Sequence, residues 1–98
     1  MIDNSQPTVT LSGSPQISGN RARVVFLAID RASYLTRAEY SVNGGEWKSV
    51  FADDGISDGP EERYTVEVPL EAAGEYSITL RAFDANGNAG NSRSVAKR

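Results

Sequence analysis

Oxygen-bearing side chains in three loops have the chemistry of a calcium site. Asp30 ends an apolar run, and Asp84 ends an alternating run. Asp54 and Asp58 lie in an acidic loop between them, and Asn86 follows Asp84 by two residues. Calcium takes about six to eight oxygen ligands from carboxylates, amides and carbonyls. These five residues therefore predict a calcium pole, provided that the fold brings their loops together.

Two other interpretations of these acids stay open. Their spacing departs from the D-x-[DN]-x-[DN]-G pattern of calcium loops, and Asp and Asn commonly cap turns through local backbone hydrogen bonds. Asp30 and Asp84 also resemble the carboxylate pair of a glycoside hydrolase. However, the chain has no His and no Cys for a nucleophile and base pair, and so small a domain rarely encloses a substrate. We therefore expect no enzymatic activity and no cofactor other than calcium.

The stretch 74–84 is the element around which these loops are arranged. Apolar side chains from Tyr76 to Ala82 alternate with polar ones from Ser77 to Arg81. This period of two is that of a half-buried strand, whereas a helix would scatter the apolar residues. The sequence therefore predicts a strand here with one face in the core.

The remaining patterns predict an all-β domain. A length of 98 residues suits one domain with one core. Residues 3–7 are polar and end in proline, so we expect 1–7 to be a linker or domain entry and the domain to cover 8–98. The predicted strands are 8–12, 21–30, 37–43, 47–51, 63–70, 74–84 and 89–96.

The predicted strand 21–30 is apolar on both faces. We assign the even-numbered residues 22–28 to the core. With this assignment Asp30 and Asp84, each at the end of its strand, both fall at inward-facing positions. Val25, Leu27 and Ile29 then point outward. Such a row is either incidental exposure beneath neighbouring side chains or a docking patch for an adjacent domain. In the second case these three residues form an interface.

Carbohydrate binding is the main alternative function. It requires exposed aromatic side chains, and the core leaves only Tyr34, Trp47, Phe51 and Phe83 for that purpose. Trp47 follows a tight hairpin, so we expect it to be buried in a structural role. Loss of glycan binding in Tyr34→Ala or Phe83→Ala would support this alternative.

Four short patterns, the first of which is the end of the strand 21–30, resemble bacterial immunoglobulin-like and fibronectin type III-like modules. Residues 40–47, Y-S-V-N-G-G-E-W, resemble the hairpin Y-S-V-D-G-G-x-W of that family, and residues 84–88, D-A-N-G-N, resemble its D-x-x-G-N turn. Leu70, Gly74 and Tyr76 resemble its tyrosine corner, in which the phenol bonds to upstream backbone.

This resemblance, which covers residues 21–92, implies an architecture. We expect a seven-stranded antiparallel immunoglobulin/fibronectin type III-like sandwich in which the family's strands A-B-E pack on C′-C-F-G. In that topology the loops that hold Asp30, Asp54, Asp58 and Asp84 gather at one end of the sandwich.

The resemblance also implies a role. Such modules are usually non-catalytic structural, adhesion or accessory domains of larger secreted or surface bacterial proteins. We therefore expect an extracytoplasmic location, adjacent domains of the same chain as partners, and protein or glycan ligands. As an isolated domain we expect a monomer.

Composition limits other classes of function. The net charge is −3 and the basic residues are scattered, which argues against nucleic acid as a partner. No window reaches the ~18 apolar residues of a membrane span, so we expect no membrane insertion. Cysteine is absent, so no disulfide supports the fold and the redox compartment stays open.

Overall fold

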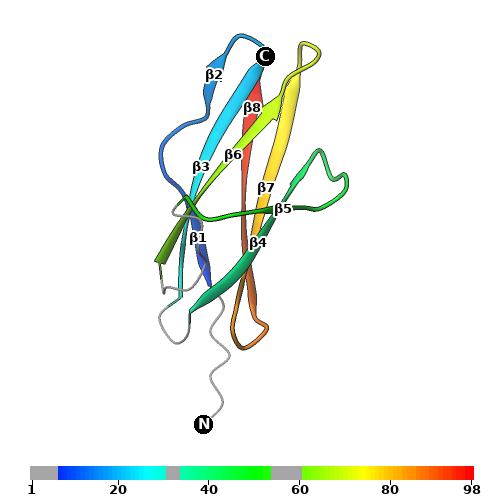
Figure 1. Cartoon of the computed structure of the whole chain (residues 1–98). Coiled ribbons are helices and arrows are strands. Elements are labelled where there is room, and N and C mark those ends of the chain that lie inside the picture. Colours follow the sequence, from blue (N-terminus) through cyan, green and yellow to red (C-terminus); the bar gives the residue numbers. More distant parts are fainter. Residues whose placement is uncertain (1–6, 31–33, 54–60) are drawn as a thin grey trace.

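The computed structural model describes residues 7–30, 34–53 and 61–98, which form two antiparallel sheets packed face to face (Figure 1). The described part of the chain contains strands and turns but no helix. The strands are β1 (Thr8–Leu11), β2 (Gln16–Ser18), β3 (Arg21–Ile29), β4 (Leu35–Val42), β5 (Lys48–Val50), β6 (Glu61–Pro69), β7 (Glu75–Asp84) and β8 (Ala89–Lys97).

The two sheets have the predicted strand pairing. In the first sheet β3 is central, with β6 along one edge and both β1 and β2 along the other. The second sheet has the order β5-β4-β7-β8. The prediction of an antiparallel sandwich with A-B-E facing C′-C-F-G is therefore confirmed.

One strand was not predicted. β2 pairs with the start of β3 through a tight turn, in which Gly19 has a φ of 60°. All three residues of β2 are exposed, so no alternation of apolar and polar residues marks it as a strand. Because β1 and β2 lie on the same edge of β3, they act as one edge strand that is interrupted around Gly13 and Pro15.

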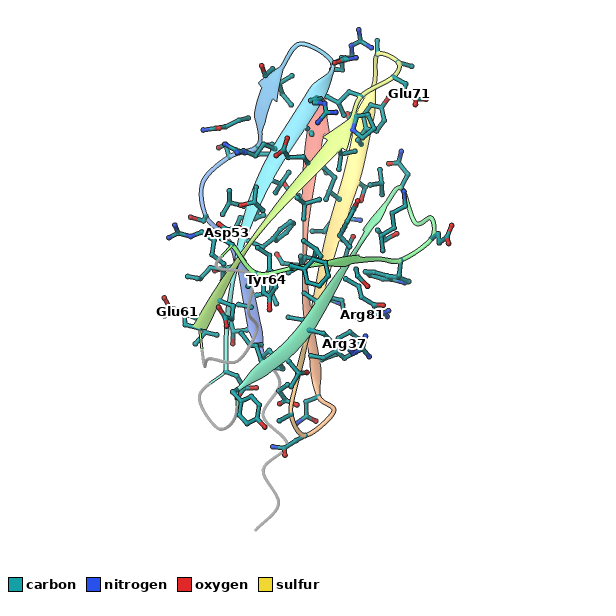
Figure 2. The ribbon with its side chains drawn as sticks, in the orientation of Figure 1. Arg37, Asp53, Glu61, Tyr64, Glu71 and Arg81 are labelled. Atoms are coloured by element: carbon teal, nitrogen blue, oxygen red, sulfur yellow. The ribbon has the colours of Figure 1, made fainter. Side chains whose placement is uncertain are left out.

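The core lies between the sheets and is made by the inward face of every long strand. The even-numbered residues of β3 from 22 to 28 are at most 1% exposed, which confirms the predicted parity. Phe26 and Tyr64 are opposite each other on β3 and β6, and both are fully buried. Figure 2 shows Tyr64 in the middle of the sandwich. From the second sheet, Leu80 and Leu35 fill the same space.

The hairpin between β4 and β5 turns in the way that its sequence predicts. Asn43 and Gly44 have φ values of 54° and 72°, a backbone that Asn and Gly adopt readily. The Asn43 side chain also accepts a hydrogen bond of 2.8 Å from the backbone N–H of Ser77 on β7. The turn is thereby attached to the neighbouring strand.

Close backbone packing joins β1 to the second sheet. The carbonyl of Pro7 occupies the position that a Cβ atom at residue 90 would take, so only glycine fits there. Gly90 lies near the start of β8. The beginning of the described chain is thus held against the sheet opposite the one to which β1 belongs.

The tyrosine corner is formed as predicted. The Tyr76 hydroxyl donates to the carbonyl of Ala72 at 2.8 Å and accepts from the Ala72 N–H at 3.0 Å. Leu70 is fully buried, and Gly74 has a φ of 139°, which lets the chain reverse into β7. Arg98 donates to the Leu70 carbonyl at 2.7 Å, so the end of the chain supports the same corner.

Removing the Tyr76 hydroxyl is expected to destabilise the fold. Tyr76→Phe keeps the ring but loses both bonds to Ala72, so the free energy of unfolding should fall by about 1–2 kcal/mol. Urea unfolding measures the change. Tyr34→Phe is the control, because Tyr34 is 51% exposed and its substitution should have little effect. Equal losses in both variants would contradict a structural role for the corner.

Candidate functional site

The structure brings together two of the five residues proposed for the calcium pole. Asp30 follows β3 and Asp84 ends β7, and their side chains are hydrogen-bonded to each other. Both are buried, with 2% and 4% of their surface exposed. Asp54 and Asp58 lie outside the described residues. The contribution of Asn86 to this pole is its backbone N–H, which donates to Asp84 Oδ1 at 2.9 Å.

Asp84 caps the turn between β7 and β8. Its Oδ1 also accepts the backbone N–H of Asn88 at 2.8 Å, and its Oδ2 accepts the Asn88 side-chain amide at 3.3 Å. Burial raises the pKa of Asp84, but the hydrogen bonds from Asn88, Asp30 and Asn86 outweigh burial and hold that pKa below its ordinary value of 3.8. The ionised carboxylate is thus stabilised by the turn that it closes.

The paired carboxyl groups do not have the geometry of a glycosidase. Catalytic carboxylates lie about 5 Å or more apart so that a sugar or a water fits between them. Asp30 and Asp84 instead contact each other, so no sugar or water fits between them. Among residues 7–30, 34–53 and 61–98, no group of three or more acids is arranged to hold a metal ion. The calcium hypothesis therefore stays a prediction.

The lowered pKa of Asp84 predicts how stability depends on pH. Ionised Asp84 stabilises the folded chain above its unfolded pKa of 3.8, and this contribution is lost as the pH falls from there toward the lower folded pKa. Asp84→Asn keeps an oxygen for the turn but removes the charge. In urea unfolding, the stability gap between the original chain and this variant should be widest near pH ~6 and shrink toward pH ~2. A gap that stays constant with pH would contradict this role.

The apolar row on β3 faces outward as predicted, but it is partly covered. Val25, Leu27 and Ile29 are half-buried, and polar residues lie beside them on the neighbouring strands. Leu27, for example, lies between Thr10 of β1 and Arg63 of β6. The partial cover supports incidental exposure, and the docking patch stays a prediction.

Two adjacent substitutions test which side of β3 faces the core. Leu27→Glu places a carboxylate beside Arg63, so it should lower the free energy of unfolding by less than about 1 kcal/mol. Phe26→Ala leaves a cavity in the core and should cost about 3–5 kcal/mol. Urea unfolding of both variants measures the difference. The assignment fails if Leu27→Glu is the more damaging change.

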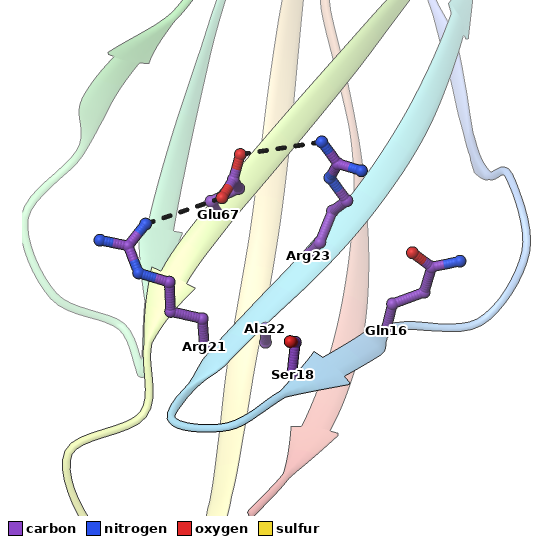
Figure 3. Close-up of a pocket in the computed structure, with 6 residues that line it drawn as sticks. All are labelled: Gln16, Ser18, Arg21, Ala22, Arg23 and Glu67. Carbon is purple, nitrogen blue, oxygen red and sulfur yellow. Dashed lines mark ion pairs between the residues drawn. The ribbon is translucent and has the colours of Figure 1, made fainter.

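A shallow pocket of about 240 Å³ lies where β2, β3 and β6 meet. Figure 3 shows Arg21 and Arg23 converging on Glu67, with the ion pairs at 3.7 and 4.0 Å. All three side chains are about half exposed or more, and such solvated pairs contribute at most about 1 kcal/mol each. Among the described residues, no aromatic side chain lines this pocket, so it is a solvated ion-pair cluster without a ring on which a ligand could stack.

The outward face of β4 and β7 carries a stack of arginines and aromatic rings. The Arg37 guanidinium lies 3.8 Å from the centre of the Phe83 ring, and the Arg81 guanidinium lies 3.9 Å from that of Trp47. Glu39 pairs with both arginines, at 3.6 Å and 2.8 Å. We call these five residues the arginine–aromatic face. Figure 2 shows Arg37 and Arg81 on the same side of the sheet.

This face corrects one prediction and adds residues that the sequence analysis missed. Trp47 is 37% exposed rather than buried, because it packs on Arg81 outside the sheet and not in the core. Arg37, Glu39 and Arg81 were not singled out. Strand alternation places each of them outward, but their contacts arise only because β4 and β7 are neighbours in register.

The fold can be compared with known proteins. No family model and no curated protein matches the sequence. The PKD1 domain of Vibrio anguillarum Epp has a similar structure, with a TM-score of 0.70 and 14% sequence identity, over 97% of this chain and 95% of that one. The sulfane dehydrogenase SoxCD from Paracoccus pantotrophus matches 86% of this chain with a TM-score of 0.65 and 20% identity, and the match spans only 23% of that chain.

These likenesses define a class of fold. Together with the observed sheets, they place the chain among immunoglobulin-like β-sandwiches, and the PKD1 match extends over almost the whole of both domains. At sequence identities of 14% and 20%, these similarities support a shared fold and nothing about function. The finer resemblance to bacterial immunoglobulin-like and fibronectin type III-like modules stays an expectation.

Proposed function

We propose that this chain is a non-catalytic module that positions neighbouring domains in a larger extracytoplasmic protein. The observation that carries the proposal is the placement of the chain ends. Pro7 contacts Gly90 at the pole where β3 and β7 end, whereas Arg98 bonds to Gly74 at the opposite pole. Domains attached before and after this one would be held apart by the length of the sandwich.

The size of the separation follows from the strands. β7 has ten residues and runs from one pole to the other. At about 3.4 Å per residue it spans about 30 Å. A rigid element of this length sets a minimum distance between its neighbours, which a flexible linker does not do.

The direction of the first and last strands suits mechanical load. β1 and β8 both start at the pole of Pro7 and Gly90, and each is hydrogen-bonded antiparallel to a central strand of its sheet. Tension between the chain ends would pull along these strands, so their backbone hydrogen bonds would be loaded together rather than one after another. The arrangement therefore supports a spacer that stays folded under tension.

Two further observations support a non-catalytic, multidomain setting. The carboxyl pair at the pole is buried and engaged in a turn, which leaves it no access to a substrate. A similar fold covers 23% of the SoxCD chain and nearly all of the PKD1 domain, which is itself a domain of Epp, so in both cases it is part of a larger protein. The described residues contain no helix long and apolar enough to cross a membrane.

Single-molecule pulling tests the mechanical part of the proposal. Pulling from the two chain ends should require a higher unfolding force than pulling between Arg98 and a cysteine at residue 73, introduced as Ala73→Cys. Both attachment points of the second geometry lie at one pole, so the force would peel β8 from β7 one hydrogen bond at a time. The chain has no other cysteine, so the attachment is specific. Equal forces in the two geometries would contradict a load-bearing role.

A further inference from the structure

A second pocket lies beside the arginine–aromatic face, between β4 and β5. It has a volume of about 150 Å³ and is lined by Arg37, Glu39, Ser49 and Phe51, among others. Phe51 is 77% exposed, the largest exposed fraction among the large hydrophobic side chains of the described residues. A phenyl ring left in solvent beside a pocket offers an apolar surface on which a ligand ring can stack.

The polar groups of this pocket are held in place. The Arg37 guanidinium lies over the Phe83 ring, 3.8 Å from its centre, which restricts its movement, and the Arg37 side chain is still 60% exposed. Glu39 is held by Arg81 at 2.8 Å, and Ser49 lies opposite Glu39 on β5. A planar guanidinium that is already oriented loses little entropy when its donors bind a carboxylate.

The charge of this sheet face differs in sign from that of the whole chain. The outward positions of β4, β7 and β8 hold four cations and two glutamates, whereas the chain carries a net charge of −3. One of the cations, Lys97, pairs with Glu75 far from the pocket, which leaves the arginines in excess near it. The cations are Arg37, Arg81, Arg93 and Lys97, and the glutamates are Glu39 and Glu75. A local excess of positive charge on an acidic protein favours an anionic ligand.

We propose that the pocket between β4 and β5 binds an acidic polysaccharide, with a uronic acid ring stacked on Phe51 and its carboxylate on the Arg37 guanidinium. Glu39 and Ser49 then bind ring hydroxyls, and the cationic face beside the pocket follows the rest of the sugar chain. The pocket is smaller than the roughly 300 Å³ of typical small-molecule sites, so it holds one ring of a polymer. This activity goes beyond the positioning role and does not depend on it.

Titration calorimetry with polygalacturonate tests the proposal, with EDTA present to exclude calcium bridges between polymer chains. The full chain should bind polygalacturonate, should not bind neutral dextran, and should lose affinity as sodium chloride is added. Phe51→Ala should weaken binding by about tenfold, and Arg37→Gln should weaken it by at least about fivefold.

Two matched variants control for general losses. Tyr34→Ala removes another exposed aromatic ring, and Arg23→Gln removes an exposed arginine from the other sheet. Each should change the affinity by less than about twofold, because neither residue lines the pocket. Urea unfolding of all four variants checks that they are folded under the conditions of the titration.

Poly-L-glutamate distinguishes a sugar from an acidic peptide. It should bind more weakly than polygalacturonate, and Phe51→Ala should leave its affinity unchanged because it has no ring to stack. Equal binding of the two polymers, with no effect of Phe51→Ala on either, would overturn the assignment in favour of a general acidic partner. Equal binding of dextran, or no binding of polygalacturonate, would overturn it as well.

Discussion

The burial of Phe26 and Tyr64 between two facing sheets is the interaction on which the rest of the fold depends. These two rings lie opposite each other on β3 and β6, and they fill the centre of a core that has no disulfide to support it. Each fully buried ring contributes about 2–3 kcal/mol through the removal of apolar surface from water. That contribution fixes which face of every strand points inward, and so it also fixes which residues are left outside to bind anything.

Strand alternation made most of this architecture predictable from the sequence. Each long strand has one buried face, so its apolar residues recur at every second position, and the parity of β3 followed even though both of its faces are apolar. β2 was not predictable in this way, because it has three residues and no buried side chain. Its pairing depends on the turn at Gly19 and on the free edge of β3.

The candidate sites were predicted less well, because the sequence does not show which strands are neighbours in space. Asp30 and Asp84 were expected at one pole and do meet there, but the sequence could not indicate that they would contact each other and close a turn. Arg81 and Glu39 are separated by 42 positions in the chain and form the shortest ion pair described. Trp47 was expected in the core because the sequence does not show that Arg81, on another strand, covers its ring on the outside of the sheet.

The contact between Pro7 and Gly90 sets how an upstream neighbour would be oriented. Because the first described residue lies on the backbone of β8, the direction in which the chain arrives is determined by a residue near the opposite end of the sequence. A side chain at residue 90 would displace that segment and tilt whatever precedes it. If another domain precedes this one, a single substitution at residue 90 would therefore alter the angle between the two domains, although residue 90 lies in neither the linker nor the neighbour.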